Sequence, residues 1–305
     1  MKTTWGKIVD GTLLFQLFVN GLSIGAIYIL LVFGLQLIIR TTGIVNFAHG
    51  EMYVFGAYTF WFTYSVLDLH LGFAVILTVI VMAIISGVVY RAVFHYVQAR
   101  FKADTPLSDK ALMSAMASIG LMMVLSRIIV LYFGTDQKGI PSFLPQVFVF
   151  SGIRLPAERL SIILIAVLIA GILSFFFFGT KLGKAMRAVS TDSLASKLMG
   201  INSDRIFIAS FALGSILAGV AGLLIAPVFA LDPAMGTEII FMAMLVMVFG
   251  GINSYKGAVY AGITVGLAES FGYYFIGIIS HVLLFVMVMV FLIFRPGGFF
   301  GEALE

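Results

Sequence analysis

The chain has 305 residues, of which 61% are hydrophobic and 10% charged, and its mean hydropathy is +1.13. A soluble domain is roughly 45–50% apolar and about 25% charged, so this composition excludes a soluble fold. The absence of cysteine excludes disulfides, thiolate metal sites and thiol nucleophiles. The net charge of +4 is typical of a membrane protein, and no Lys/Arg-rich patch interleaved with aromatic residues indicates nucleic-acid binding.

Long apolar runs predict membrane-spanning helices. A helix of about 20 apolar residues covers roughly 30 Å, the thickness of the hydrocarbon core of a bilayer. The first run follows Lys2 and Lys7 without a small-residue cleavage site, so we expect it to be retained as a span rather than removed as a signal peptide. Five charge-free runs exceed 20 residues each: 11–39, 69–90, 160–180, 206–231 and 270–294. The sequence therefore predicts an all-α, polytopic membrane protein.

Basic residues gather in two segments, 91–112 and 181–205, which together hold nine of the 18 Lys and Arg residues. Because basic residues accumulate in cytoplasmic loops, both segments are predicted to be cytoplasmic. Two predicted helices separate them, so segment 134–159 is expected on the outer side of the membrane. Its Pro and Gly content predicts an ordered extracytoplasmic loop with no helix of its own.

Two polar, Gly-interrupted stretches break otherwise apolar sequence and resemble each other. In each, an Asn precedes a Gly by four residues and a cationic or titratable residue directly precedes that Gly: Asn46 to Gly50, and Asn253 to Gly257. A backbone break in lipid is tolerated only where protein or a water-filled path surrounds it. Paired breaks point to a central transport path. We therefore expect broken or re-entrant helices at both places.

The region around the second break is predicted in more detail. Asp232 to Glu238 is expected to form a short external turn. Arg295 is expected inside, which requires an odd number of crossings between residues 239 and 294. Three crossings would be tight in that length, so one of them is predicted to be broken.

Three polar residues near membrane depth are candidates for function. A charge at the bilayer centre costs about 2.5–3.5 kcal/mol on insertion scales, so Glu269 is either near the path or a pin that ties helices together. Glu51 follows the first break, where capping of a helix N-terminus is favoured over gating. His49 is a candidate pH-sensitive gate or a histidine packed at the break.

No enzymatic motif is present. The sequence contains neither a complete phosphate-binding G-x-x-x-x-G-K-[ST] motif nor HExxH, and its four histidines are scattered. If the protein uses energy for its function, we expect another chain or an ion gradient to supply it. The segment 183–200 alternates basic and apolar residues at helical spacing, which is compatible with an interfacial helix, a helix that docks on a partner protein, or a solvated basic loop.

The segment Gly43–Glu51, followed by Gly56-Ala57-Tyr58, resembles the signature of the inner-membrane permeases of branched-chain amino-acid ABC transporters, the LivH type. The resemblance covers nearly the whole chain, as one permease domain over 1–305. Its further motifs are Asn20-Gly21, Gly183–Ala188 with Asp192, Gly200–Arg205, Gly250–Ile252 with Ser254, Gly266–Glu269 and Arg295–Gly301.

The resemblance implies a type II-like importer permease with about eight spans in the bacterial inner membrane. It implies a second, related permease, two ABC ATPase subunits that use ATP, and a periplasmic substrate-binding protein, with no cofactor or metal bound by this chain. The residues expected to contact the ATPase are Gly183, Arg187, Asp192, Leu198, Gly200, Asp204 and Arg205. Those expected at the path or gate are Asn46, His49, Gly50, Glu51, Gly251, Asn253 and Glu269.

The sequence leaves the substrate open. Asn253 stands where the family usually has Gly, and Lys256 where it often has Pro. The resemblance favours branched-chain or other hydrophobic amino acids, with urea, short amides or aromatic acids as alternatives within the family. Outside it, an ion-driven secondary transporter or channel would also use broken helices and a midplane Glu, and would work without an ATPase.

Overall fold

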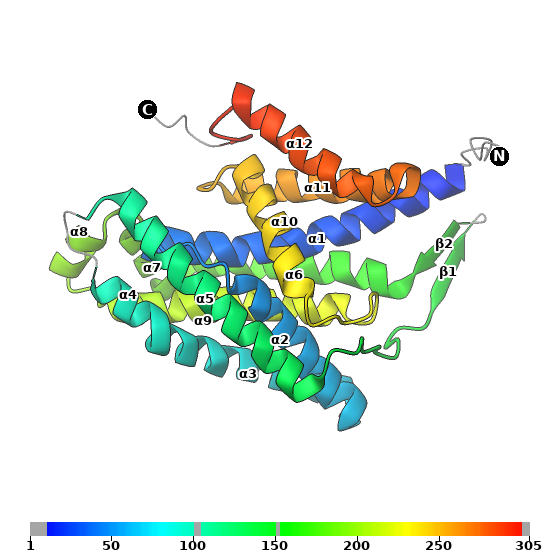
Figure 1. Ribbon diagram of the computed structural model, residues 1–305, viewed down its shortest axis with the longest axis horizontal. Helices are drawn as coiled ribbons and strands as arrows, with labels where there is room; N and C mark the ends of the chain where they lie inside the picture. Colours follow the sequence, from blue (N-terminus) through cyan, green and yellow to red (C-terminus); the bar gives the residue numbers. More distant parts are fainter. Residues whose placement is uncertain (1–10, 101–104, 151–152, 301–305) are drawn as a thin grey trace.

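The computed structural model describes residues 11–100, 105–150 and 153–300, and these are mostly helical (Figure 1). A π turn, Phe62–Val66, extends the helix that begins at His49, and a second one, Tyr90–Phe94, joins the helix that ends at Val89 to the one that begins at His95. The helices are α1 (Gly11–Thr42), α2 (His49–Trp61), α3 (Leu71–Val89), α4 (His95–Ala99), α5 (Leu107–Phe133), α6 (Ala157–Gly179), α7 (Lys181–Thr191), α8 (Ser193–Leu198), α9 (Ser203–Ile225), α10 (Met235–Gly250), α11 (Tyr255–Ile276) and α12 (Ile279–Phe294).

Several helices are suited to cross a membrane, as the apolar runs predict. Five are long and apolar enough: Gly11–Thr42, Leu71–Ala99, Ser108–Phe133, Ala157–Gly179 and Ser203–Ile225. From Met235 onward, the described part of the chain forms three more helices, α10, α11 and α12, of which α10 and α12 have 16 residues each. The predicted all-α, polytopic class is confirmed. Three crossings were predicted to fit tightly between residues 239 and 294. The structure has three helices there, α10, α11 and α12, of which α10 and α12 are short.

The two ends of the molecule differ. Helices α4, α7 and α8 lie at one end, and the start of α1 lies at the other with a β-hairpin (Figure 1). The hairpin pairs β1 (Val147–Phe150) with β2 (Ile153–Pro156) in antiparallel register. The described parts of the basic segments 91–112 and 181–205 therefore lie at the end opposite the hairpin, which belongs to the Pro- and Gly-rich segment.

Helix α1 is the centre of the molecule, because close contacts between glycines hold it against α11 on one side and α9 on the other. A Cβ at Gly25 would lie 2.6 Å from the carbonyl oxygen of Gly262, and one at Gly21 would lie 2.9 Å from that of Gly266. On the α9 side, a Cβ at Gly34 would lie 2.7 Å from the carbonyl oxygen of Gly214. Small residues let helix backbones approach in this way within lipid.

Helix α2 also packs through close contacts at glycines. Gly56 meets the backbone of Gly219 on α9, Gly222 of α9 meets the carbonyl of Tyr53, and Gly50 meets the carbonyl of Gly236 on α10. Helices α1, α2, α9, α10 and α11 thus form one compact group, which we call the central helices. The other long helices lie around it.

Candidate translocation site

The first predicted break lies between α1 and α2. Gly43 has a positive φ of 71°, and the chain stays non-helical until His49. Helix α5 satisfies two backbone amides of the break, because Ser114 Oγ accepts from the N–H of Val45 at 3.1 Å and Ser118 Oγ accepts from the N–H of Phe47 at 3.0 Å. A backbone interruption in lipid is therefore covered by protein, as it must be.

Three polar side chains at this break are buried. Asn46, His49 and Glu51 are each at most 1% exposed. The amide oxygen of Asn46 and both carboxylate oxygens of Glu51 make no hydrogen bond to the described residues. Glu51 lies in the first turn of α2, which favours a carboxylate through the helix dipole, but it does not cap the helix.

The second predicted break lies between α10 and α11. Gly251 ends α10 with φ of 100°, and Ser254 Oγ caps α11 by accepting from the N–H of Gly257 at 3.0 Å. The buried Gln36 of α1 donates from Nε2 to the carbonyls of Gly251 and Ser254, both at 3.2 Å. Asn253 is exposed. The break is thus bonded directly to α1.

Both breaks lie beside the same turn of α1. The ring of His49 lies against Gly34, and Gln36, two residues further along, is bonded to the second break. Residues two apart on a helix point to nearly opposite faces. The structure therefore places the two interruptions on opposite sides of one helix.

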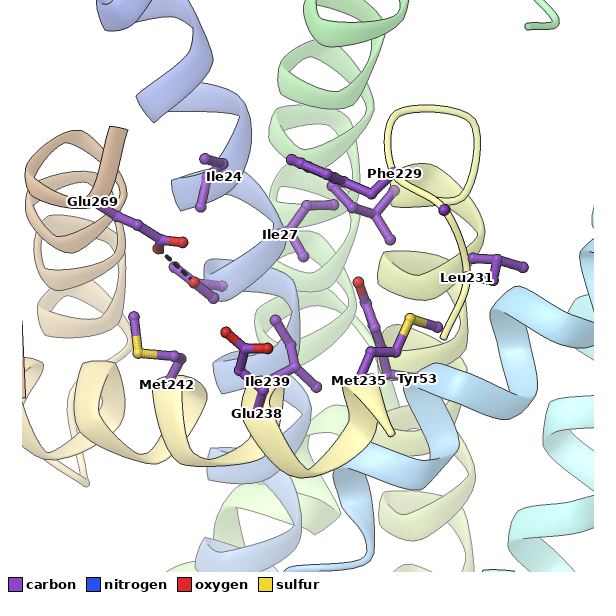
Figure 2. Close-up of a pocket in the computed structure, with 13 residues that line it drawn as sticks. Ile24, Ile27, Tyr53, Phe229, Leu231, Met235, Glu238, Ile239, Met242 and Glu269 are labelled. Carbon is purple, nitrogen blue, oxygen red and sulfur yellow. Dashed lines mark hydrogen bonds between the residues drawn. The ribbon is translucent and has the colours of Figure 1, made fainter. Parts of the chain in front are cut away.

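A cavity of about 180 Å³ lies near the middle of α1 (Figure 2). The hydroxyl of Tyr28 donates to Glu269 Oε2 at 2.6 Å, and His281 Nε2 of α12 lies 3.4 Å from Glu269 Oε1 and 3.9 Å from Glu238 Oε1. The carboxylates of Glu238 and Glu269 point into the same space (Figure 2). Glu269 thus both faces a cavity and links α1 to α11.

Sequence reasoning singled out Glu269 but missed its neighbours. Glu238 was expected in an external turn, whereas α10 begins at Met235 and carries Glu238 in its first turn. Tyr28 and Tyr53 lie within apolar sequence, where tyrosine is unremarkable. A carboxylate at the start of the apolar run 239–250 was the one signal that could have drawn attention to this cavity.

The family model described as branched-chain amino acid transport system, permease component, matches residues 17–294. The chain belongs to this family.

Its relatives are similar over almost their whole length. The permease protein BraD of the high-affinity branched-chain amino acid transport system of Pseudomonas aeruginosa is 30% identical over 94% of this chain and 95% of its own. The permease protein LivH of Salmonella typhimurium is 27% identical over 93% and 94%. A solved structure, PsaBC from Streptococcus pneumoniae in complex with Fab, has 13% identity and a TM-score of 0.48 over 93% of this chain and 91% of that one.

The basic segment 181–205 of this permease forms two short helices, α7 and α8, in place of a single amphipathic one. Gly183 packs against the backbone of Phe176 and Phe177 on α6, and the guanidinium of Arg187 lies 4.7 Å from the ring centre of Phe178. Asp192 caps α8 by accepting from the backbone N–H of Leu194 and Ala195 at 2.8 and 2.9 Å. These contacts fix the segment on the end of α6.

The far end of the segment presents apolar side chains. Leu198 is 84% exposed and Met199 is 83% exposed. Gly200 follows with φ of 82°, a conformation that a residue with a side chain rarely adopts. Asp204 and Arg205, in the first turn of α9, are also exposed. Of the residues predicted for coupling, Gly183 is buried, and the others are exposed: Arg187, Asp192, Leu198, Gly200, Asp204 and Arg205.

Proposed function

We propose that this chain is the membrane-spanning subunit of an ATP-driven, type II-like importer of branched-chain amino acids in the bacterial inner membrane. The family match over 17–294 and the two relatives named for branched-chain amino acid transport support this assignment. The chain works without catalysis of its own. It binds no cofactor, and ATP is hydrolysed by separate subunits.

The assembly contains four kinds of component. A second, related permease lies beside this chain in the lipid and completes the translocation path. Two ABC ATPase subunits bind on the cytoplasmic side, and a periplasmic binding protein delivers the substrate. This division of labour is consistent with a chain that lacks a complete phosphate-binding motif.

The membrane orientation follows from charge. We place the end that carries α7 and α8 in the cytoplasm, because the basic segments 91–112 and 181–205 lie there. The hairpin segment 134–159 then lies outside. The single permease domain, 1–305, has about eight spans in this arrangement, with α2 and α10 as the short elements next to the breaks.

The path lies beside the two breaks. Asn46, His49, Gly50 and Glu51 of the first break, Gly251 and Asn253 of the second, and Glu269 at the cavity form its walls or gates. Buried polar groups without partners support this assignment for the first break. Such groups are retained where a transport path needs them, since each is costly in lipid.

Coupling to the ATPase acts through α7 and α8. The observation that carries this assignment is the exposed apolar pair Leu198 and Met199, held by a capped helix and flanked by Lys197 at the cytoplasmic end. An exposed apolar group with a basic rim suits a groove on a partner protein. Nucleotide-dependent movement of that groove would shift this chain against its sister permease.

The assembly is tested first by gentle detergent purification of the tagged chain from its native membrane. We expect a second permease and an ATPase with a Walker A motif to co-purify. A chain that purifies alone and still moves leucine in liposomes would overturn the proposal in favour of an ion-driven transporter.

The coupling surface is tested with Leu198→Asp, which changes an exposed side chain and leaves the caps of α8 and α9 in place. We expect the variant to insert normally, to lose the ATPase and to abolish uptake. Arg187→Glu and Gly200→Trp are expected to abolish uptake as well. The matched control is Ile278→Asp, which changes a 78% exposed residue in the turn between α11 and α12, at the opposite end. Wild-type uptake in Leu198→Asp would remove the coupling assignment.

A further inference from the structure

The cavity near the middle of α1 is placed where a substrate would pass. Its walls come from the middle of α1, the first turns of α2 and α10, the end of α9, the loop 229–231 and Glu269 of α11. The loop and the start of α10 interrupt helical structure at this depth. Substrate sites of repeat-built transporters lie near the midplane at such interruptions. The inference below rests on the proposed function.

The polar groups of the cavity favour a cationic ligand. Glu238 and Glu269 point into one space, and His281 Nε2 approaches both carboxylates. The guanidinium of Arg159 bonds instead to Ser23 and lies over the ring of Phe229 at the edge of the cavity, with no ion pair to either carboxylate. One histidine cannot balance two ionised carboxylates even when it is protonated. Glu238 makes no hydrogen bond to the described residues, and its side chain is 72% exposed. It is therefore free to bind a donor that enters the cavity.

Tyr53 provides an independent sign of a ligand. Its side chain is 4% exposed, lines the cavity and directs its hydroxyl into it (Figure 2). This hydroxyl has no hydrogen-bond partner among the described residues, whereas that of Tyr28 is bonded to Glu269. A buried side chain that directs an unpartnered hydroxyl into a cavity leaves that hydroxyl to water or to a ligand that enters the cavity.

The remaining walls are branched and apolar. Ile24, Ile27, Ile239 and Met242 surround the carboxylates. The volume of about 180 Å³ equals the share of roughly six water molecules at about 30 Å³ each, well below the ~300–1,000 Å³ of pockets for drug-sized ligands. The cavity therefore suits one small solute with a positively charged head and a compact apolar side chain.

We propose that this cavity binds the α-ammonium group of a branched-chain amino acid during transport. Glu238 and Glu269 accept hydrogen bonds from the ammonium group, the hydroxyl of Tyr53 adds a further acceptor, and the isoleucines contact the aliphatic side chain. Charge-assisted hydrogen bonds of this kind are about twice as strong as neutral ones. The permease itself therefore selects against urea, amides and acids that lack an ammonium group.

The test measures leucine binding to the full chain, purified in detergent with the subunits that accompany it and freed of the binding protein. Equilibrium dialysis with radiolabelled leucine gives the affinity. We expect isopentylamine, which keeps the ammonium group and the branched side chain, to compete with leucine. Isocaproate, which lacks the ammonium group, should not compete.

Two substitutions locate the site. Glu238→Gln changes an exposed side chain with little risk to folding, and we expect leucine binding to weaken about tenfold or more. Tyr53→Phe should weaken it about twofold to tenfold. The matched controls are Thr237→Val, the neighbour of Glu238 outside the cavity, and Tyr64→Phe, which makes the same change in the π turn that extends α2, outside the cavity. Both controls should bind leucine as the wild type does.

The outcomes separate this inference from the proposed function. If the wild type takes up leucine but Glu238→Gln binds and transports it equally well, or if isocaproate competes as strongly as isopentylamine, the inference is overturned and the proposed function stands. A wild-type chain that binds no leucine also overturns it. If the complete assembly takes up no branched-chain amino acid, the proposed function fails, and this inference fails with it.

Discussion

The central helices and the surrounding helices are equally apolar in sequence but differ sharply in burial. In the most apolar stretch of α1, 83% of the residues are buried, and in α9 67% are. The corresponding share is 17% in both α5 and α6, although α6 is the most apolar of the five long spans. Hydropathy therefore predicts which helices enter the membrane and says little about which of them pack together.

The difference lies in the small residues. Lipid chains are as apolar as leucine, so helices in a membrane gain little from hiding apolar surface and associate through close packing. Gly21 and Gly25 of α1 face Gly262 and Gly266 of α11, one turn apart on each helix. On α6, by contrast, a Cβ at Gly171 would meet no atom within 4 Å.

The largest expected effect follows from filling one of these contacts. Gly25→Leu would place a side chain against the backbone of Gly262, where there is no flexible group to move aside. We expect folded protein to be lost, as seen by size-exclusion chromatography of a fluorescent fusion in mild detergent. Gly171→Leu makes the same change on α6 and should elute as the wild type does. Equal behaviour of the two variants would contradict the distinction between the two groups of helices.

The next effect concerns the hydrogen bonds that hold the second break. Gln36→Leu keeps the size of a side chain that is fully buried but removes its hydrogen bonds to the carbonyls of Gly251 and Ser254, each of which keeps one backbone donor. Each hydrogen bond within a protein contributes about 0.5–1.5 kcal/mol to stability. We expect a clearly lower thermal unfolding midpoint in detergent.

The control for that substitution is Thr264→Val on α11. It removes a hydrogen bond too, but an exposed one from the threonine hydroxyl to the carbonyl of Tyr260 within the same helix. Its midpoint should stay close to that of the wild type. A midpoint of Gln36→Leu as high as that of this control would mean that α1 does not stabilise the break.

Much of this arrangement could be predicted from sequence. The membrane class, the breaks near Asn46–Gly50 and Asn253–Gly257 and the family follow from apolar runs, glycines and motif order, which are local properties of the chain. The cavity could not be predicted, because Tyr28, Tyr53 and Glu238 lie on three helices and meet only after packing. Local patterns carry no information on which faces of equally apolar helices meet.

Glu269 shows the same limit at one residue. Its position between two apolar runs indicates a role but does not distinguish a path residue from a pin. The structure gives it features of both, since it faces the cavity and accepts a hydrogen bond from Tyr28. A pair of substitutions is needed to separate the two roles.

Glu269→Gln removes the charge and keeps an oxygen that accepts the hydrogen bond from Tyr28. We expect leucine uptake in proteoliposomes to fall about tenfold, in line with the loss of a charge-assisted hydrogen bond, while the yield of assembled protein stays near that of the wild type. Tyr28→Phe does the reverse, because it keeps the charge and removes the bond. If uptake and assembly fall together in Glu269→Gln, the residue is a structural pin.

The smallest expected effect lies within the run of four phenylalanines on α6, which the sequence presents as equivalent. Phe177 stacks on Tyr255 of α11 with ring centres 5.6 Å apart, so it joins α6 to the central helices, whereas Phe175 is 74% exposed. An aromatic pair contributes about 0.5–1.5 kcal/mol beyond its buried area. Phe177→Leu should therefore lower the thermal unfolding midpoint by a few degrees, and Phe175→Leu should leave it unchanged, since exposed substitutions stay within about 0.5 kcal/mol. Equal shifts of the two midpoints would show that α6 packs against its neighbours on both of these faces. Helix α6 would then have to be counted among the central helices.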